Sequence, residues 1–183
     1  MRLRTPLVAT VLVVAVLSAG CVGPFAGDST PVATPTGPEG IPTPTPAGVH
    51  GSYEQTTVTV VDDGTGAELG RVEAAIADNR SLRYTGLSDT DELPENRGML
   101  FVYEAEQDLT YVMREMSFDL DVLFVYGNGT IESIHERPAP ESGEDGESIR
   151  AAGEGQYVLE VNRGWTESRG VEEGDRLEFE LPG

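Results

Sequence analysis

Residues 110–126 constrain the fold of this chain more than any other stretch, because they are too long and too mixed in polarity to form one strand. Their sequence is TYVMREMSFDLDVLFVY, in which polar side chains stand directly before the apolar run 122–125. Such a run is typical of an interior strand that is buried on both faces. Strands usually contain about five or six residues, so we expect a break at residues 116–119.

Short strands separated by turn sequences occupy most of residues 56–183. The turn sequences at residues 62–66 and 127–129 each predict a hairpin. The expected strands are residues 56–61, 68–77, 98–103, 109–114, 120–126, 130–136, 156–161 and 176–181.

Two short helices are expected between these strands. Asp78 is a good N-cap for a helix over residues 79–85, and a second helix is expected over residues 163–169. The acidic, glycine-rich residues 138–155 are expected to form a loop. These patterns predict an α+β fold, mostly β, in which seven or eight short strands form a compact barrel-like sheet with two short helices.

The composition is strongly acidic and lacks lysine. The chain has 32 Asp and Glu against 12 basic residues, all of them Arg, and its formal net charge is −20. This balance excludes binding of nucleic acid through a basic surface. A folded domain with so many carboxylates and no lysine is expected of a protein adapted to near-saturated salt, where the Debye length is about 3 Å or less. A calcium-binding or otherwise acidic secreted protein is the alternative.

The first 20 residues have the pattern of a signal peptide, with two arginines before an apolar segment at residues 7–17. The small residues that follow it end at Cys21, and residues 17–21 resemble the lipobox of secreted lipoproteins. We therefore expect lipid on Cys21 to anchor an exported protein to the outer face of the cytoplasmic membrane. An unmodified cysteine in an uncleaved anchor is the alternative. Repeated Thr-Pro makes the remainder of residues 21–55 a disordered stalk.

Several motifs in the predicted domain follow one another as in the family called domain of unknown function 192. They are Glu92-Leu93-Pro94, Gly98-Met99-Leu100-Phe101, Met113-Arg114, Leu120-Asp121-Val122-Leu123-Phe124, His135-Glu136, Tyr157-Val158-Leu159-Glu160 and Gly170 through Gly174-Asp175-Arg176. The resemblance covers roughly residues 58–181 and implies a small, barrel-like β domain, often exported, with no established activity. One departure is the family sequence Met-Lys-Asn-Thr, where this chain has Arg114, Glu115 and Met116 after Met113.

Four side chains are candidates for a ligand site: Arg114, Asp121, His135 and Glu160. Asp121 precedes the apolar run 122–125, where a buried carboxylate needs partners. Arg114 is the expected bidentate partner. A ligand-facing carboxylate is one interpretation of Asp121. A structural ion pair or a turn-capping carboxylate is the other, and we favour it because such residues commonly bind backbone donors.

No motif for metal, cofactor or nucleophilic catalysis accompanies these residues. His135 is the single histidine of the predicted domain, and its spacing from the acidic residues matches no metal motif. We therefore expect a non-enzymatic binding or envelope-associated module, with an envelope glycan or protein as its partner, and the sequence gives no oligomeric state. The alternative is a hydrolase or carbohydrate-active enzyme that uses Asp121 or Glu160 with His135. Asn79 and Asn128 each begin an N-glycosylation sequence.

Overall fold

A seven-stranded sheet forms the body of the protein in the computed structural model, which describes residues 50–183. The predicted signal peptide, Cys21 and nearly all of the predicted stalk lie outside the described residues. The strands are β1 Gln55–Val61, β2 Glu68–Ala77, β3 Arg97–Val112, β4 Leu120–Val125, β5 Ile131–Arg137, β6 Arg150–Asn162 and β7 Arg176–Glu178. The helical elements are α1 Arg80–Thr85 and two 3-10 turns, η1 Gly146–Ser148 and η2 Glu167–Arg169. This confirms the predicted α+β, mostly β class.

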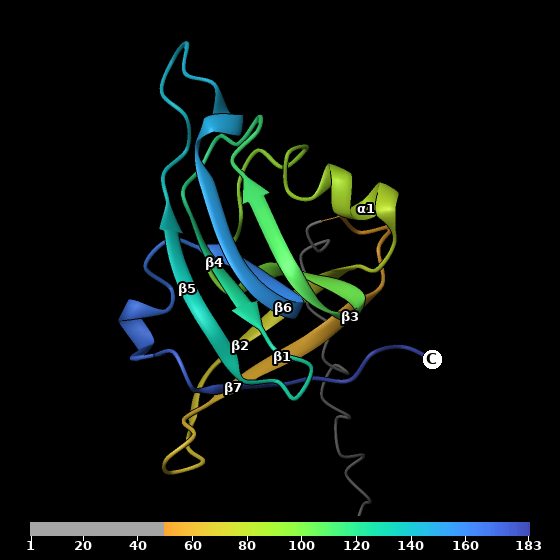
Figure 1. Ribbon diagram of the computed structural model, residues 1–183, viewed down its shortest axis with the longest axis vertical. Coiled ribbons are helices and arrows are strands. Elements are labelled where there is room, and N and C mark those ends of the chain that lie inside the picture. The colour runs from red at the N-terminus through yellow and green to blue at the C-terminus, as the bar shows by residue number, and fades with distance from the viewer. Residues whose placement is uncertain (1–49) are drawn as a thin grey trace, which may run out of the picture. The chain divides into compact units, whose positions relative to one another are not determined.

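The strand order is β5-β4-β6-β3-β2-β1-β7, and every neighbouring pair is antiparallel except β2 and β3. That parallel pair is joined by a crossover through α1, as parallel neighbours require. The sheet curls into a half-barrel (Figure 1), and a bridge between Thr130 and Arg176 joins its two ends. Among residues 50–183, no helix has the length and apolarity needed to cross a bilayer.

Both faces of the sheet are covered, so two separate cores form. The face covered by α1, here the helix face, buries alternate residues of the interior strands: Met99, Phe101, Val122, Phe124 and Val158. The opposite face, here the tryptophan face, is covered by Trp165 and buries Leu100, Leu123, Val125, Leu159 and Val161. Every residue of β4 is consequently buried, which confirms the interior strand predicted from the apolar run.

The predicted break at residues 116–119 is confirmed, because β3 ends at Val112 and β4 begins at Leu120. The chain turns there with Glu115 at a φ of +57°. The predicted hairpins of β1 with β2 and of β4 with β5 are also present.

Several elements differ from the prediction, and β7 ends at Glu178 rather than at Leu181. β3 is one 16-residue strand rather than two, since it continues through the exposed residues 104–108 with a register shift between Val102 and Gln107. β6 begins at Arg150, inside the predicted loop 138–155. The second predicted helix is reduced to the single turn η2. The cap of α1 is Asn79, whose side chain accepts hydrogen bonds from two backbone N–H groups, rather than Asp78.

Candidate functional site

A cavity of about 200 Å³ lies between α1, the segment that follows α1 and the helix face of the sheet. Its apolar wall is contributed mainly by Leu87, Phe101, Met116 and Leu120. Its charged and titratable side chains are Arg83, Tyr84, Tyr103, Tyr111, Arg114 and Glu160. The cavity therefore has both apolar and polar walls, and ligand pockets use the polar groups to orient what they bind.

Glu160 supplies the one carboxyl group that lines this cavity. On β6 it lies between Met99 of β3 and Val122 of β4, so both of its cross-strand neighbours are apolar. The residue is only 6% exposed, and within residues 50–183 no hydrogen bond or ion pair reaches its side chain. Burial alone raises the pKa of Glu160 to about 8, which leaves the group largely protonated at neutral pH.

Two tyrosines form a second polar group in the cavity wall. The hydroxyls of Tyr103 and Tyr111 lie 3.0 Å apart and share a hydrogen bond. The ring of Tyr111 packs edge-on against Phe101 and Phe124, with centroid distances of 4.9 and 5.9 Å. Burial, followed by the nearby Tyr103, raises the pKa of Tyr111 well above its usual value, so the Tyr111 hydroxyl is a neutral hydrogen-bonding group.

Two arginines line the cavity, and each is held by its surroundings. The guanidinium of Arg83 lies 4.6 Å above the Tyr103 ring and donates to two backbone carbonyl groups. The guanidinium of Arg114 lies 4.2 Å above the Tyr84 ring and donates to the Tyr84 carbonyl oxygen over 2.7 Å. Glu147 approaches Arg114 to 3.9 Å. Stacking and hydrogen bonds thus fix both cations in the cavity wall.

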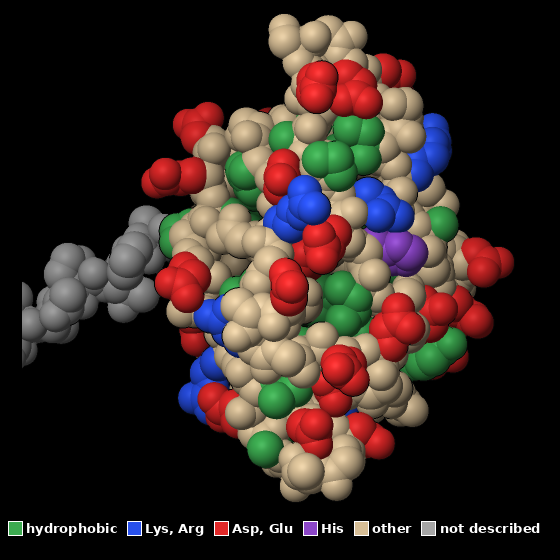
Figure 2. Space-filling view, turned by 90° about the vertical axis from the view of Figure 1, so that its left-hand side faces the viewer, with side chains coloured by type: hydrophobic (Ala, Val, Ile, Leu, Met, Phe, Trp, Pro, Cys, Tyr) green, Lys and Arg blue, Asp and Glu red, His purple; other side chains and the backbone are tan. Residues whose placement is uncertain are grey.

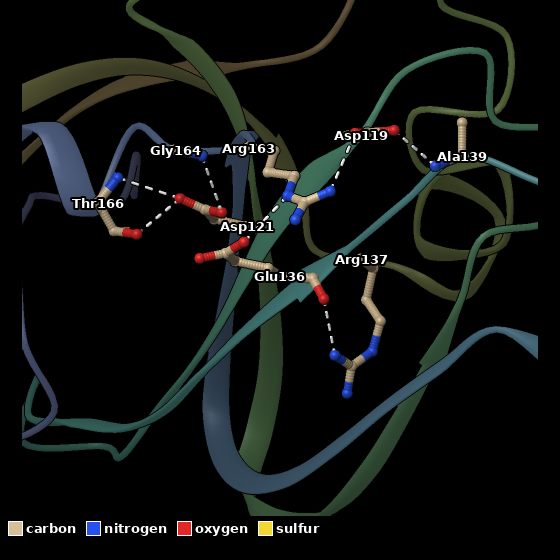
Figure 3. A network of polar contacts seen from close by, with 8 residues as sticks. All are labelled: Asp119, Asp121, Glu136, Arg137, Ala139, Arg163, Gly164 and Thr166. Carbon is tan, nitrogen blue, oxygen red and sulfur yellow. Dashed lines mark hydrogen bonds and ion pairs between the residues drawn. The ribbon is translucent and has the colours of Figure 1, made fainter.

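The expected ion pair between Arg114 and Asp121 is absent, so this prediction is wrong. Asp121 accepts three hydrogen bonds from the turn after β6: from the backbone N–H groups of Gly164 and Thr166 at 3.1 and 3.0 Å, and from the Thr166 hydroxyl at 2.6 Å. Figure 3 shows these contacts. The favoured interpretation of Asp121 as a structural, turn-capping carboxylate is therefore confirmed.

A network of exposed ion pairs surrounds this buried carboxylate. Arg163 bridges Asp119 and Glu136, with N···O distances of 3.3 and 2.9 Å, and Asp119 also accepts a hydrogen bond from the Ala139 N–H group (Figure 3). All three charged side chains are close to half exposed, so each ion pair contributes little to stability on its own. The network ties β4, β5 and the turn after β6 together.

His135 lies outside the cavity. Val122 pairs with both Glu160 and His135, so the three side chains share the helix face, but His135 is two strands away from Glu160, a distance of about 10 Å. Its ring packs edge-on against Phe124 at 5.5 Å, and its Nδ1 lies 3.0 Å from Arg137. Burial, followed by the charge of Arg137, lowers the pKa of His135 and so favours its neutral form.

The structure therefore brings together two of the four predicted site residues. Arg114 and Glu160 line one cavity, whereas Asp121 and His135 are placed elsewhere. The sequence interpretation missed Arg83, Tyr103 and Tyr111. Two-residue alternation along β3 puts Tyr103 on the same face as Phe101, which is the signal that could have indicated it.

The described part of the chain contains no metal cluster, and the asparagine of each of its N-glycosylation sequences is exposed. Within residues 50–183, no three His, Cys, Asp or Glu side chains converge as metal ligands do. Asn128 is exposed at the tip of the β4–β5 hairpin, where its side chain accepts a hydrogen bond from the Thr130 N–H group. Asn79 is also exposed while it caps α1.

Comparison with known proteins identifies the relatives of this domain. The model of the DUF192 family, described as an uncharacterized ACR, matches residues 60–179. The chain belongs to the DUF192 family. The match covers all seven strands at least in part, so the family domain coincides with the curled sheet. A comparison with curated proteins finds no match.

Two crystal structures share the fold of this DUF192 domain. A candidate transcription regulator from Sinorhizobium meliloti 1021 is 29% identical, with a TM-score of 0.61 over 69% of this chain and 95% of the other. A protein of unknown function from Novosphingobium aromaticivorans DSM 12444 is 27% identical, with a TM-score of 0.55 over 69% of this chain and 86% of the other.

Proposed function

We propose that this DUF192 protein is an exported, membrane-tethered binding domain that holds a small molecule in the cavity beneath α1, without turning it over. One observation carries the proposal: Glu160 is 6% exposed, lines the cavity and has no partner within residues 50–183. The carboxyl oxygens of Glu160 are not among the fully enclosed unpaired atoms of residues 50–183, so they reach the space of the cavity. A polar group that points into a cavity without a protein partner is available to a ligand.

The sequence outside the domain supports an extracellular location for this site. The lipobox-like residues 17–21 and the Thr-Pro-rich stalk would hold the domain outside the membrane. The acidic surface fits the high salt around a haloarchaeal cell, and Figure 2 shows Asp and Glu side chains spread over the visible face with few Arg among them. These features support the proposed location on the outer face of a haloarchaeal membrane.

Two other functions have weaker support. Transcription regulation, suggested by the Sinorhizobium meliloti relative, requires an approach to DNA, and a net charge of −20 opposes that approach. A hydrolase using Asp121 or Glu160 with His135 requires these groups to meet at one substrate. Asp121 already accepts three hydrogen bonds from the turn after β6, and neither it nor His135 lines the cavity.

The proposal is tested by dialysing the full-length protein, in detergent and molar salt, against the low-molecular-weight fraction of a cell extract. Met116 lines the cavity and belongs to the buried helix-face core, so Met116→Trp should fill the cavity, whereas Gln107→Trp places the same side chain on an exposed position of β3 that does not line it. We expect mass spectrometry to find a molecule retained by the wild-type and Gln107→Trp proteins but not by Met116→Trp. Equal retention by all three, or its chemical conversion by the wild-type protein, would overturn the proposal.

A further inference from the structure

The chemistry of the cavity indicates what kind of molecule it accepts. We propose that the ligand carries a primary amine, whose ammonium group binds beside Glu160 while its carbon body packs along Phe101, Tyr103 and Tyr111. This inference rests on the proposed binding function and specifies its ligand.

Glu160 lacks donors, and the sheet around it cannot supply them. Its cross-strand neighbours are Met99 and Val122, and no other carboxyl group lines the cavity. An ammonium group offers three donors and the countercharge that a buried carboxylate requires. A ligand with that group would satisfy in one step both the missing hydrogen bonds and the missing charge.

The other charged and titratable groups of the cavity do not take this role. Arg83 and Arg114 stack on tyrosine rings and donate to backbone carbonyl groups, and neither forms an ion pair with Glu160. Tyr103 and Tyr111 bind each other through their hydroxyls, and Tyr84 supports Arg114. Because the protein's own cations are engaged elsewhere, a cationic ligand group has no competitor at Glu160.

The walls and size of the cavity also fit a small amine. Aromatic faces attract an ammonium group and pack well against aliphatic carbon, and Phe101, Tyr103 and Tyr111 present three rings. An apolar cavity of about 150 Å³ binds benzene. The volume of about 200 Å³ therefore accommodates one small molecule with a short hydrocarbon chain.

Binding of an amine at this place must release a proton. The buried Glu160 carboxyl is largely protonated at neutral pH, while an alkylamine keeps its charge up to a pKa of about 10.4. An ion pair forms only after the carboxyl loses its proton, so amine affinity should rise about tenfold per pH unit until Glu160 is ionised. A ligand that accepts a hydrogen bond from the protonated carboxyl would show the opposite trend.

Three probes of matched carbon skeleton test the inference: 3-methylbutylamine, 3-methylbutan-1-ol and 4-methylpentanoate. Titration calorimetry with the full-length protein in molar salt, from pH 6 to 9, gives each Kd and, from buffers of different ionisation enthalpy, the protons released. We expect the amine to bind at least tenfold more tightly than the other probes and to release close to one proton at pH 7. Glu160→Gln should weaken amine binding at least tenfold and remove its pH dependence, while Glu104→Gln, at an exposed acid on β3, should change neither.

Proton release from the wild-type protein needs no variant, so the test stands even if Glu160→Gln folds poorly. Binding of the alcohol or the carboxylate as tightly as the amine would overturn the amine assignment. So would binding of the amine without proton release, or no binding of any probe. The binding function itself is tested separately, by whether Met116→Trp abolishes retention of an extract component.

Discussion

Asp121 and Glu160 lie on adjacent strands but point to opposite faces of the sheet, because Glu160 is paired with Val122 rather than with Asp121. On the tryptophan side, Asp121 accepts three hydrogen bonds from the turn after β6. On the helix side, Glu160 has no partner within residues 50–183. Two buried carboxyl groups of one sheet therefore have different roles, one structural and one facing a cavity.

Asp121→Ala should destabilise the protein by about 2 to 4 kcal/mol, because it removes the acceptor for buried backbone and hydroxyl donors. Urea unfolding in molar salt measures this loss, and Glu104→Ala, at an exposed acid, should stay within about 0.5 kcal/mol of the wild type. Unchanged stability accompanied by a lost hydrolytic activity would instead support a catalytic Asp121.

Glu160 should make the protein less stable as the pH rises. The unfolded carboxyl ionises near pH 4.5, whereas the folded one keeps its proton to about pH 8, so the folded state binds more protons between these values. This residue alone then lowers the free energy of unfolding by about 1.4 kcal/mol per pH unit in that window. Subtracting the stability curve of Glu160→Gln from that of the wild type isolates the effect, and parallel curves would contradict it.

Cys21→Ser should release the protein from the membrane or leave its precursor unprocessed, because the lipid is the proposed anchor. Detergent phase partitioning and the mass of the N-terminal peptide follow both outcomes. A variant that remains processed and membrane-bound would show that the cysteine carries no anchoring lipid.

Transfer from molar salt to about 0.1 M salt should lower the melting temperature, because the Debye length grows to about 10 Å and the surface carboxylates then repel one another. Circular dichroism at several salt concentrations measures the change. A melting temperature independent of salt would argue against adaptation to a saline environment.

Turn chemistry and alternation predicted most of this fold. Asn128-Gly129 placed the β4–β5 hairpin correctly, and the apolar run 122–125 predicted a strand buried on both faces. The start of β6 was not predicted, because its Ala and Gly residues have low strand propensity. Gly153 is required there by close packing, since a Cβ atom would lie 2.5 Å from Cγ of Phe124, a contact that the sequence does not display.

Only two of the four predicted site residues line the cavity, because the register of the strands decides which side chains face it. Arg114 and Asp121 lie on opposite sides of the break between β3 and β4, which favoured an ion pair between them. The pairing of β4 with β6 turns Asp121 toward the turn that contains Thr166 instead. The sequence could not show that Glu160 lacks a partner, because this depends on which residues surround it in the folded structure.

The bridge between Thr130 and Arg176 has a consequence for solubility. An open edge strand invites other chains to add to it, and many proteins prevent this with charge. Salt screens that protection, whereas a steric block does not depend on salt. Ile131 exchanges backbone hydrogen bonds with Gly174 and Asp175, which occupies one end of the β5 edge and leaves a shorter template for aggregation.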